Sequence, residues 1–163
     1  MKLELIEILS NSGAVREFEG GTEFDRESLP DGVSFEEPVH IKGRAENIGG
    51  QVEISARVTA KLSTVCARCT KEISEDVDFS FSERLAGKDS QEDDDVILLE
   101  GSEVDIADLA LNNFITVSPM KYLCKEDCKG LCPHCGADRN QVDCGCDDEV
   151  TDPRLDVLND LFR

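Results

Sequence analysis

The sequence feature that most limits the fold is a long alternation of apolar and polar residues in the middle of the chain. Between Gln51 and Ser63 every second residue is apolar, and the segment Val33–Glu46 shows the same alternation more loosely. A period of two is typical of a strand with one buried face. Gly49-Gly50 lies between the two segments and is typical of a tight hairpin turn. The pattern therefore predicts two long antiparallel strands.

A third strand is expected at 73–82, where apolar and polar residues alternate again. With Cys66–Cys69 at the tip of a hairpin, Leu62 would face Ile73, and the pairs further from the tip would also be apolar. A slip of one residue would bury half of the charged side chains, so this register is favoured. The pattern predicts a three-stranded antiparallel meander with a Cys-x2-Cys motif at one tip.

The remaining segments predict helices beside the sheet. Asp105 is a suitable N-cap for a helix that ends before Pro119, and Pro153 is typical of the first turn of a last helix. A short strand over 2–8 and a helical turn over 24–29 are also expected. The prediction is an α+β fold: an antiparallel β-meander or partly open barrel with one or two packed helices and a C-terminal Cys-rich zinc knuckle. Residues 1–120 would form the sheet domain with its helix near 105–117, and residues 121–163 the Cys-rich zinc-binding segment and terminal helix.

The apolar runs of the chain are short. The longest uninterrupted aliphatic block is Val96–Leu99, which is too short to cross a bilayer, and the N-terminus lacks the pattern of a secretory signal. We therefore expect a cytoplasmic protein with no membrane partner. In a reducing compartment, paired cysteines are expected to act as metal ligands or redox groups rather than as disulfides.

Eight cysteines lie in four close pairs, and eight thiolates match the needs of two tetrahedral zinc ions. The favoured grouping places one zinc on the first two pairs, which would tie the hairpin tip to the chain after the helix, and the other zinc on the last two pairs. The alternative grouping joins the second pair to the third in one compact knuckle. In chain order the pairs are Cys66 and Cys69, Cys124 and Cys128, Cys132 and Cys135, and Cys144 and Cys146.

Other chemistry is less favoured by the sequence. A redox role for Cys66 and Cys69 needs a helix N-terminus to lower the thiol pKa, whereas this motif lies between predicted strands. His134 is expected to be an exposed residue of the knuckle rather than a ligand. No Ser/His/Asp set, phosphate loop or paired catalytic carboxylates stand out. We therefore expect a protein that is not an enzyme and has no small-molecule substrate.

The charge of the chain is strongly acidic but uneven. The net charge of −19 disfavours non-specific binding to nucleic acid. Residues 38–71, in contrast, hold six basic and two acidic residues, and residues 72–109 hold two basic and fourteen acidic ones. The acidic run 88–95 is expected either to dock a basic partner or to act as a solubilising loop. The candidate RNA- or partner-binding residues are His40, Lys42, Arg44, Arg57, Lys61, Arg68, Lys71, Lys121, Lys125 and Lys129; a solvated strand face is the alternative reading of the basic stretch.

The length of the glycine turn decides how the charges of the first hairpin face one another. If Gly49-Gly50 alone forms the turn, Lys42 lies opposite Arg57, and an anionic partner would stabilise these like charges. The same register also places Glu46 opposite Glu53. A four-residue turn would instead place Arg44 opposite Glu53.

Four blocks of the chain resemble the YceD-like family: "VCARCTKEI" after the long alternating strand, then "LCKEDCKGLCPHCGADRN", "CGC" and "DPRLDVLNDL". The resemblance implies a non-enzymatic ribosome-assembly factor that supports accumulation of large-subunit ribosomal RNA. It implies as partners that RNA, a basic large-subunit ribosomal protein, or both. Two other classes stay open: a zinc-stabilised interaction module unrelated to ribosomes, such as a transcription adaptor, and a thiol redox protein.

Overall fold

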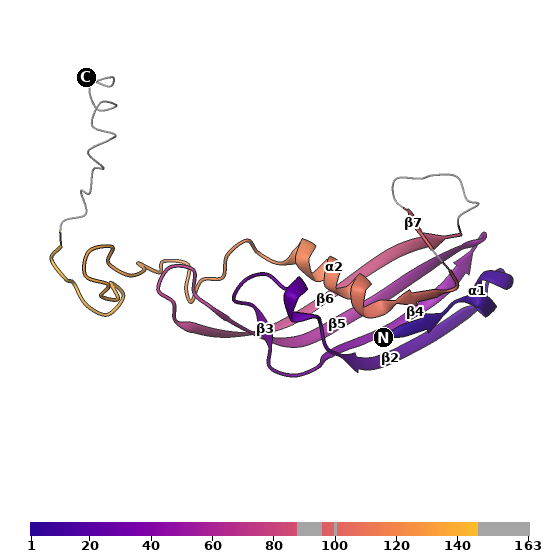
Figure 1. Ribbon diagram of the computed structural model, residues 1–163, viewed down its shortest axis with the longest axis horizontal. Helices are drawn as coiled ribbons and strands as arrows, with labels where there is room; N and C mark the ends of the chain where they lie inside the picture. The colour runs from indigo at the N-terminus through magenta and orange to yellow at the C-terminus, as the bar shows by residue number, and fades with distance from the viewer. Residues whose placement is uncertain (88–95, 100, 147–163) are drawn as a thin grey trace, which may run out of the picture.

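The computed structural model of the chain describes residues 1–87, 96–99 and 101–146. Figure 1 shows a long curved sheet with a Cys-rich segment extending from one end. The elements, in chain order, are β1 (Lys2–Glu4), α1 (Ile6–Ser10), β2 (Val15–Thr22), the 3-10 turn η1 (Arg26–Ser28), β3 (Ser34–Phe35), β4 (Val39–Ile48), β5 (Gln51–Val65), β6 (Glu72–Ala86), β7 (Val96–Leu98), β8 (Glu103–Asp105) and α2 (Ile106–Val117).

The main sheet has the strand order β2-β4-β5-β6-β7, and the short β3 pairs with β5. Adjacent strands of this sheet are antiparallel, except that β6 and β7 are parallel. Strands β1 and β8 form a separate antiparallel pair. The main sheet curls into a half-barrel (Figure 1). The described fold is thus mostly β with few helices, which agrees with the predicted meander and open barrel.

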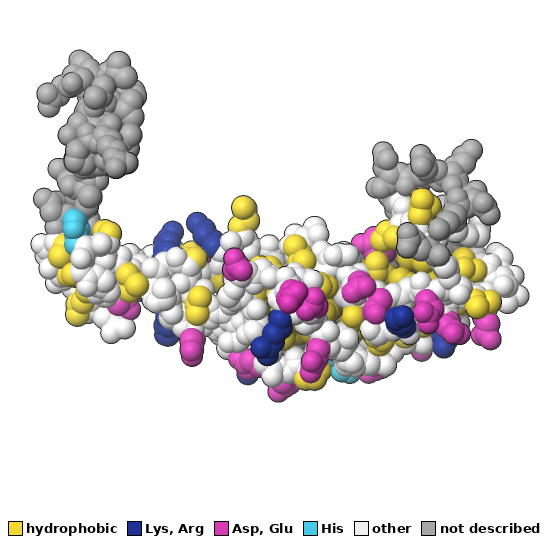
Figure 2. All heavy atoms as spheres, in the orientation of Figure 1, with side chains coloured by type: hydrophobic (Ala, Val, Ile, Leu, Met, Phe, Trp, Pro, Cys, Tyr) yellow, Lys and Arg dark blue, Asp and Glu magenta, His cyan; other side chains and the backbone are white. Residues whose placement is uncertain are grey.

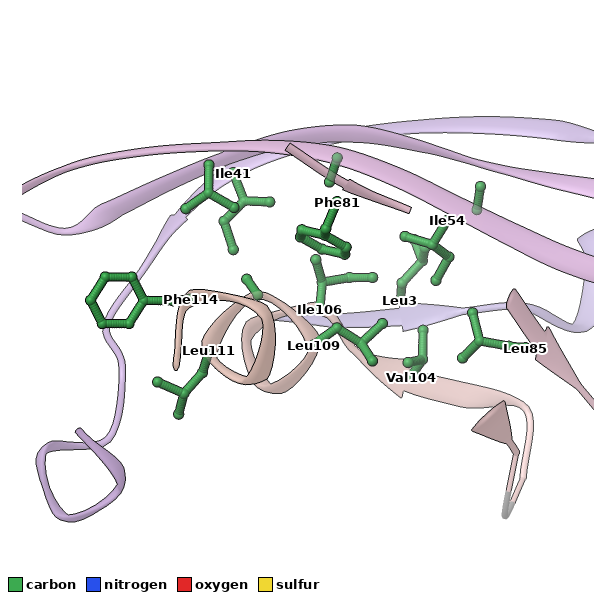
Figure 3. Close-up of a cluster of buried hydrophobic side chains, with 14 of the residues drawn as sticks. Leu3, Ile41, Ile54, Phe81, Leu85, Val104, Ile106, Leu109, Leu111 and Phe114 are labelled. Atoms are coloured by element: carbon green, nitrogen blue, oxygen red, sulfur yellow. The ribbon is translucent and has the colours of Figure 1, made fainter. Parts of the chain in front are cut away.

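The core lies between helix α2 and the concave side of the sheet (Figure 3). Phe114 and Ile106 of α2 are 2% and 0% exposed, and Ile54 of β5 is 0% exposed. Burying side chains of this size contributes roughly 1.5–3 kcal/mol each to the stability of the fold. The helix begins as predicted, because the carboxylate of Asp105 accepts the N–H of Ala107 at 2.9 Å.

The turn between β4 and β5 is the predicted two-residue turn. Gly49 and Gly50 have φ of 65° and 95°, which suits a hairpin turn whose two central residues both need positive φ. Lys42 consequently lies opposite Arg57, and Glu46 lies opposite Glu53. The alternative of a four-residue turn is wrong.

The predicted register between β5 and β6 is wrong by two residues. Leu62 pairs with Glu75 rather than with Ile73. The cause is the size of the connection, since Val65 pairs with Glu72 and six residues, including the first two cysteines, close the hairpin. A shift of two residues keeps every side chain on its predicted face, because the period of a strand is two.

The N-terminal half differs more from the prediction. Instead of one strand over 2–8, β1 ends at Glu4 and α1 follows, whereas the turn predicted over 24–29 is present as η1. Strand β2 was not predicted, because its sequence VREFEGGT lacks a clean alternation. The predicted segment Val33–Glu46 is divided between β3 and β4, with Pro38 just before β4. The acidic run 88–95 and the last predicted helix lie outside the described residues.

Candidate metal centres

The first group of cysteines joins two distant parts of the chain. Cys66 and Cys69 lie in the loop between β5 and β6, and Cys124 and Cys128 follow α2. Their sulfur atoms all lie within 4.8 Å of one another. The Sγ atoms of Cys66 and Cys128 are 3.8 Å apart, and those of Cys69 and Cys124 are 3.6 Å apart. Zinc–sulfur bonds of about 2.3 Å in a tetrahedron place sulfurs about 3.8 Å apart, so the group fits a zinc ion.

The second group lies within the Cys-rich segment itself. Cys132, Cys135, Cys144 and Cys146 also have sulfur atoms within 4.8 Å of one another. Cys132 is buried, whereas Cys135 is exposed. The structure thus brings the cysteines together in the two groups favoured from the sequence, and not in the alternative that joins the second pair to the third. Ligation of zinc by these eight residues stays a prediction.

The two Cys-x2-Cys loops have the same backbone conformation. In each loop the amide of the first cysteine, Cys66 or Cys132, donates to the carbonyl five residues later, at 2.8 Å in both cases. The amides of Thr70 and Gly136 donate back to the carbonyl of that first cysteine, at 2.9 Å in both cases. Both residues have positive φ, 58° for Thr70 and 72° for Gly136. The chain therefore builds the same cysteine turn twice, although only the second carries the glycine that favours this φ.

Backbone amides aim at the sulfur of the first cysteine in each loop. The amide of Cys124 is the largest of the causes that lower the pKa of Cys66 to about 6. The amides of Cys135 and His134 lower the pKa of Cys132 to about 6 in the same way. Amide donors favour the thiolate over the thiol, which is the form that binds a metal ion.

Cys124 in the first group and Cys146 in the second are held in the opposite state, as neutral thiols. Burial, followed by the neighbouring sulfurs, raises the pKa of Cys124 to about 12. The adjacent Cys135, followed by the other sulfurs of its group, raises the pKa of Cys146 to about 12. Four thiolates this close repel one another unless a cation lies between them. Each group therefore has the donors of a closed four-cysteine site, which leaves no open position for a substrate.

Asn140 links the two groups and was missed by the sequence analysis. Its side-chain amide donates to the sulfur of Cys128 at 3.4 Å, and its carbonyl oxygen accepts the N–H of Lys129 at 2.9 Å. The backbone bridge between Leu131 and Asp138 holds the same loops together. No local motif marks Asn140, because its partners lie eleven and twelve residues away.

Arg68 has a structural role that its predicted role as a binding residue did not anticipate. Its guanidinium donates to the carbonyl of Cys128 at 2.7 Å and to that of Glu126 at 3.4 Å. Its own carbonyl accepts the N–H of Leu131 at 3.1 Å. Arg68 therefore fastens the segment after α2 to the hairpin tip, and a change there would disturb the metal group itself.

The predicted basic face of the sheet is compensated by carboxylates within the chain. Lys42 and Arg57 lie opposite one another as predicted, but Glu19 of β2 and Asp78 of β6 flank them. The strand cations thus have partners without an external anion. The pairs and their N–O distances are Lys42 and Glu19 (2.9 Å), Arg57 and Asp78 (2.5 Å), Lys61 and Glu36 (3.5 Å), Arg44 and Glu46 (3.6 Å) and His40 and Glu19 (3.8 Å).

The remaining predicted cations lie near the metal groups. Lys125 lies 3.8 Å from Asp127. Lys71, Lys121 and Lys129 are exposed and have no carboxylate partner in the part of the chain that the structure describes. Zinc bound by four thiolates retains a net negative charge, so these lysines would partly offset the charge of loaded metal centres rather than form a strongly positive surface.

The fold and the site define a class: a curled β-sheet domain with two groups of four cysteines that could each hold a metal ion, one joining the hairpin tip to the segment after α2 and the other within the Cys-rich segment. Residues 54–162 match the family described as large ribosomal RNA subunit accumulation protein YceD. The chain belongs to this family, which confirms the resemblance recognised in the sequence.

Known relatives extend the comparison without adding a function. The uncharacterized protein YlbN of Bacillus subtilis is 28% identical over 129 residues, which cover 77% of this chain and 75% of that protein. The uncharacterized protein Rv2926c of Mycobacterium tuberculosis is 29% identical over 98 residues, 57% of this chain and 47% of that protein. The chain thus spans about half the length of this mycobacterial relative. No solved structure matches the chain. No helix in the described part of the chain is long and apolar enough to span a membrane.

Proposed function

We propose that this protein is a non-enzymatic, cytoplasmic ribosome-assembly factor that supports accumulation of large-subunit ribosomal RNA. The observation that carries the proposal is the family match over residues 54–162. The matched region begins in β5 and includes all eight cysteines. It therefore includes most of β5, all of β6 and the loop between them that holds Cys66 and Cys69.

We further propose that both cysteine groups hold zinc and that the role of the metal is structural. Four thiolates around one ion leave no site for water or substrate, which is typical of structural rather than catalytic zinc. The first ion would close the loop between Cys69 and Cys124, which are 55 residues apart. Closing a loop of this length restricts the unfolded chain, so the ion stabilises the fold.

The direct partner is, in this proposal, a basic protein of the large subunit rather than naked RNA. The net charge of −19 repels phosphates and attracts a cationic surface. The cations of the sheet face are paired with carboxylates of the same chain, which leaves few of them to neutralise phosphates. Figure 2 shows carboxylate groups interspersed with the lysine and arginine groups over the sheet domain. RNA contact through Lys71, Lys121 and Lys129 is the competing outcome.

Depletion of the protein tests the biological part of the proposal. We expect the ratio of large- to small-subunit ribosomal RNA to fall on depletion and to recover with the wild-type gene. An unchanged ratio, together with no ribosomal particles on the tagged protein, would exclude the proposed function and favour an interaction module or a thiol redox protein.

Affinity purification with and without ribonuclease separates the two partner classes. We expect a basic large-subunit protein to stay bound after ribonuclease treatment and to be lost as salt is raised, because screening weakens charge attraction. Loss of all partners after ribonuclease treatment, or on changing Lys71, Lys121 and Lys129 to Glu, would instead assign direct RNA binding. Glu17→Gln with Glu19→Gln is the control, because it changes the charge of the protein at a site away from these lysines.

A further inference from the structure

One edge of the main sheet is open over most of its length. Strand β6 pairs with β5 from Glu72 to Leu85, but its other neighbour, β7, covers only Arg84–Ala86. In the described part of the chain, no backbone hydrogen bond reaches the outer side of residues 72–83, which we call the open edge. Figure 1 shows β6 along the rim of the sheet, between the metal-binding tip and β7. Unpaired N–H and C=O groups in such a row are a template for another strand.

The two faces of the open edge differ in chemistry. Side chains at even positions point outward, and Glu72, Asp76 and Asp78 among them are exposed carboxylates. Val77 and Phe79, at odd positions, are half-buried and pack against the core, and Glu75 and Glu83 lie on either side of them on the same face. Residues 72–83 hold five acidic residues and no basic one. Asp78 is paired with Arg57, whereas Glu72 and Asp76 have no partner in the described structure.

We propose that the open edge of β6 binds, by strand addition, an extended peptide segment in which basic and apolar residues alternate. The added backbone would satisfy the unpaired groups of β6, since main-chain hydrogen bonds supply affinity in this mode and alternate side chains supply specificity. Basic side chains of the segment would meet Glu72 and Asp76, and its apolar side chains would extend the surface of Val77 and Phe79. The inference rests on the proposed function only in placing this segment in a basic large-subunit protein.

The charges of the open edge also disfavour a second copy of the chain as its occupant. Two copies of β6 paired edge to edge would place carboxylates opposite or diagonal to carboxylates, and like charges so placed are destabilising. A lysine- or arginine-bearing strand removes this repulsion. The other edge strand, β2, is a poorer candidate because it spans eight residues, contains two glycines and carries Arg16 beside its glutamates.

Peptide binding to the zinc-loaded full chain tests the mode. The probe is a capped peptide of alternating arginine and valine, measured by fluorescence anisotropy and by amide chemical shifts. We expect saturable binding with shifts concentrated in residues 72–83, and at least tenfold weaker binding of a peptide with the same composition in two blocks. Two further peptides carry methyl groups on the backbone nitrogens of every second residue, one on the odd residues and one on the even residues. The peptide whose methylated nitrogens face β6 should not bind, and the other should bind normally.

Two charge variants locate the site. Glu72→Gln with Asp76→Asn should weaken peptide binding roughly fivefold, because each removes one favourable cross-strand pair. Glu17→Gln with Glu19→Gln removes the same charge from β2 and should leave binding unchanged. Zinc content and thermal unfolding verify that both variants fold.

Three outcomes would overturn the inference: equal binding of the block peptide, equal binding of both methylated peptides, or shifts outside the open edge. Any of these means charge adsorption without strand addition. If the probe fails in this way while the wild-type chain still co-purifies with large-subunit particles, the proposed function stands and the open edge is not its binding site. If the probe binds as expected but ribosomal RNA is unaffected by depletion, the edge proposal stands and its partner lies elsewhere.

Discussion

The two cysteine groups use the same turn in very different settings. The first group connects the tip of the β5–β6 hairpin to the segment after α2, and three of its four cysteines are buried. The second group draws all four cysteines from residues 132–146, and only Cys132 is buried. With metal bound, the same local turn would stabilise the whole domain in one case and a short segment in the other. What decides the difference is the length of chain that each metal ion would close.

The largest expected effect follows from this difference. Cys69→Ser should remove one zinc ion and destabilise the sheet domain by on the order of 4 kcal/mol, the contribution of a cross-link that closes a loop of this length. Cys135→Ser should remove the other ion and leave the sheet transition nearly unchanged. Metal analysis and thermal unfolding of the two variants measure both effects. Equal destabilisation by the two variants would contradict the contrast between the two settings.

A second, smaller effect tests whether the two groups are coupled. Asn140→Ala removes the amide that contacts the sulfur of Cys128 and the acceptor for the N–H of Lys129. Changes in groups that support metal ligands typically lower affinity about 10–100-fold, and this link is a single one, so we expect about tenfold weaker zinc binding at the first group. Competition with a chelator measures the affinity. Gln141→Ala is the control, because its side-chain amide donates a hydrogen bond to Asp138 and not to a cysteine.

Sequence patterns predicted the features that depend on neighbours along the chain. The two-glycine turn, the cap at Asp105 and the alternating faces of β5 follow from local rules. The two cysteine groups also agree with the favoured grouping, because the eight residues between Cys135 and Cys144 are enough for a loop that brings the last two pairs together. The predicted register of β6 was wrong, since the cysteine loop takes up six residues where the four residues Cys66–Cys69 were assumed.

Features that depend on distant contacts were not predictable in this way. Strand β2 pairs with β4, and the ring of Phe18 lies over Gly43, where an added Cβ would come within 2.7 Å of Phe18 Cζ. The roles of Asn140 and Arg68 also depend on chain segments that only the fold brings together. The ion pairs of the basic face were not foreseen for the same reason, because Glu19 and Asp78 come from strands outside the basic stretch.

A reciprocal exchange at the two turns should have a still smaller effect. Gly136→Thr places a β-branched residue at positive φ in the second loop and should cost about 1–2 kcal/mol there, seen as weaker zinc binding. Thr70→Gly relieves this strain in the first loop but adds freedom to the unfolded chain, so the two effects should nearly cancel. Competition with a chelator measures the zinc affinity of both variants, and thermal unfolding measures their stability. A large gain of stability from Thr70→Gly would show that the strain in the first loop exceeds this expectation.

The smallest expected effect belongs to the sheet alone and should leave both metal groups loaded. The hydrogen bond from Arg57 lowers the pKa of Asp78 below its ordinary value of 3.8. A carboxylate with a lowered pKa in the folded state stabilises the protein above its unfolded pKa, and this contribution is lost as the pH falls through the folded pKa. The difference in unfolding free energy between wild type and Asp78→Asn should therefore be constant above about pH 5 and shrink as the pH falls below 3.8. Both side chains are largely exposed, so the difference is small and decreases with salt. In an Arg57→Gln background, the effect of Asp78→Asn on the unfolding free energy should depend less on pH. An undiminished dependence there would mean that a group other than Arg57 lowers the pKa of Asp78.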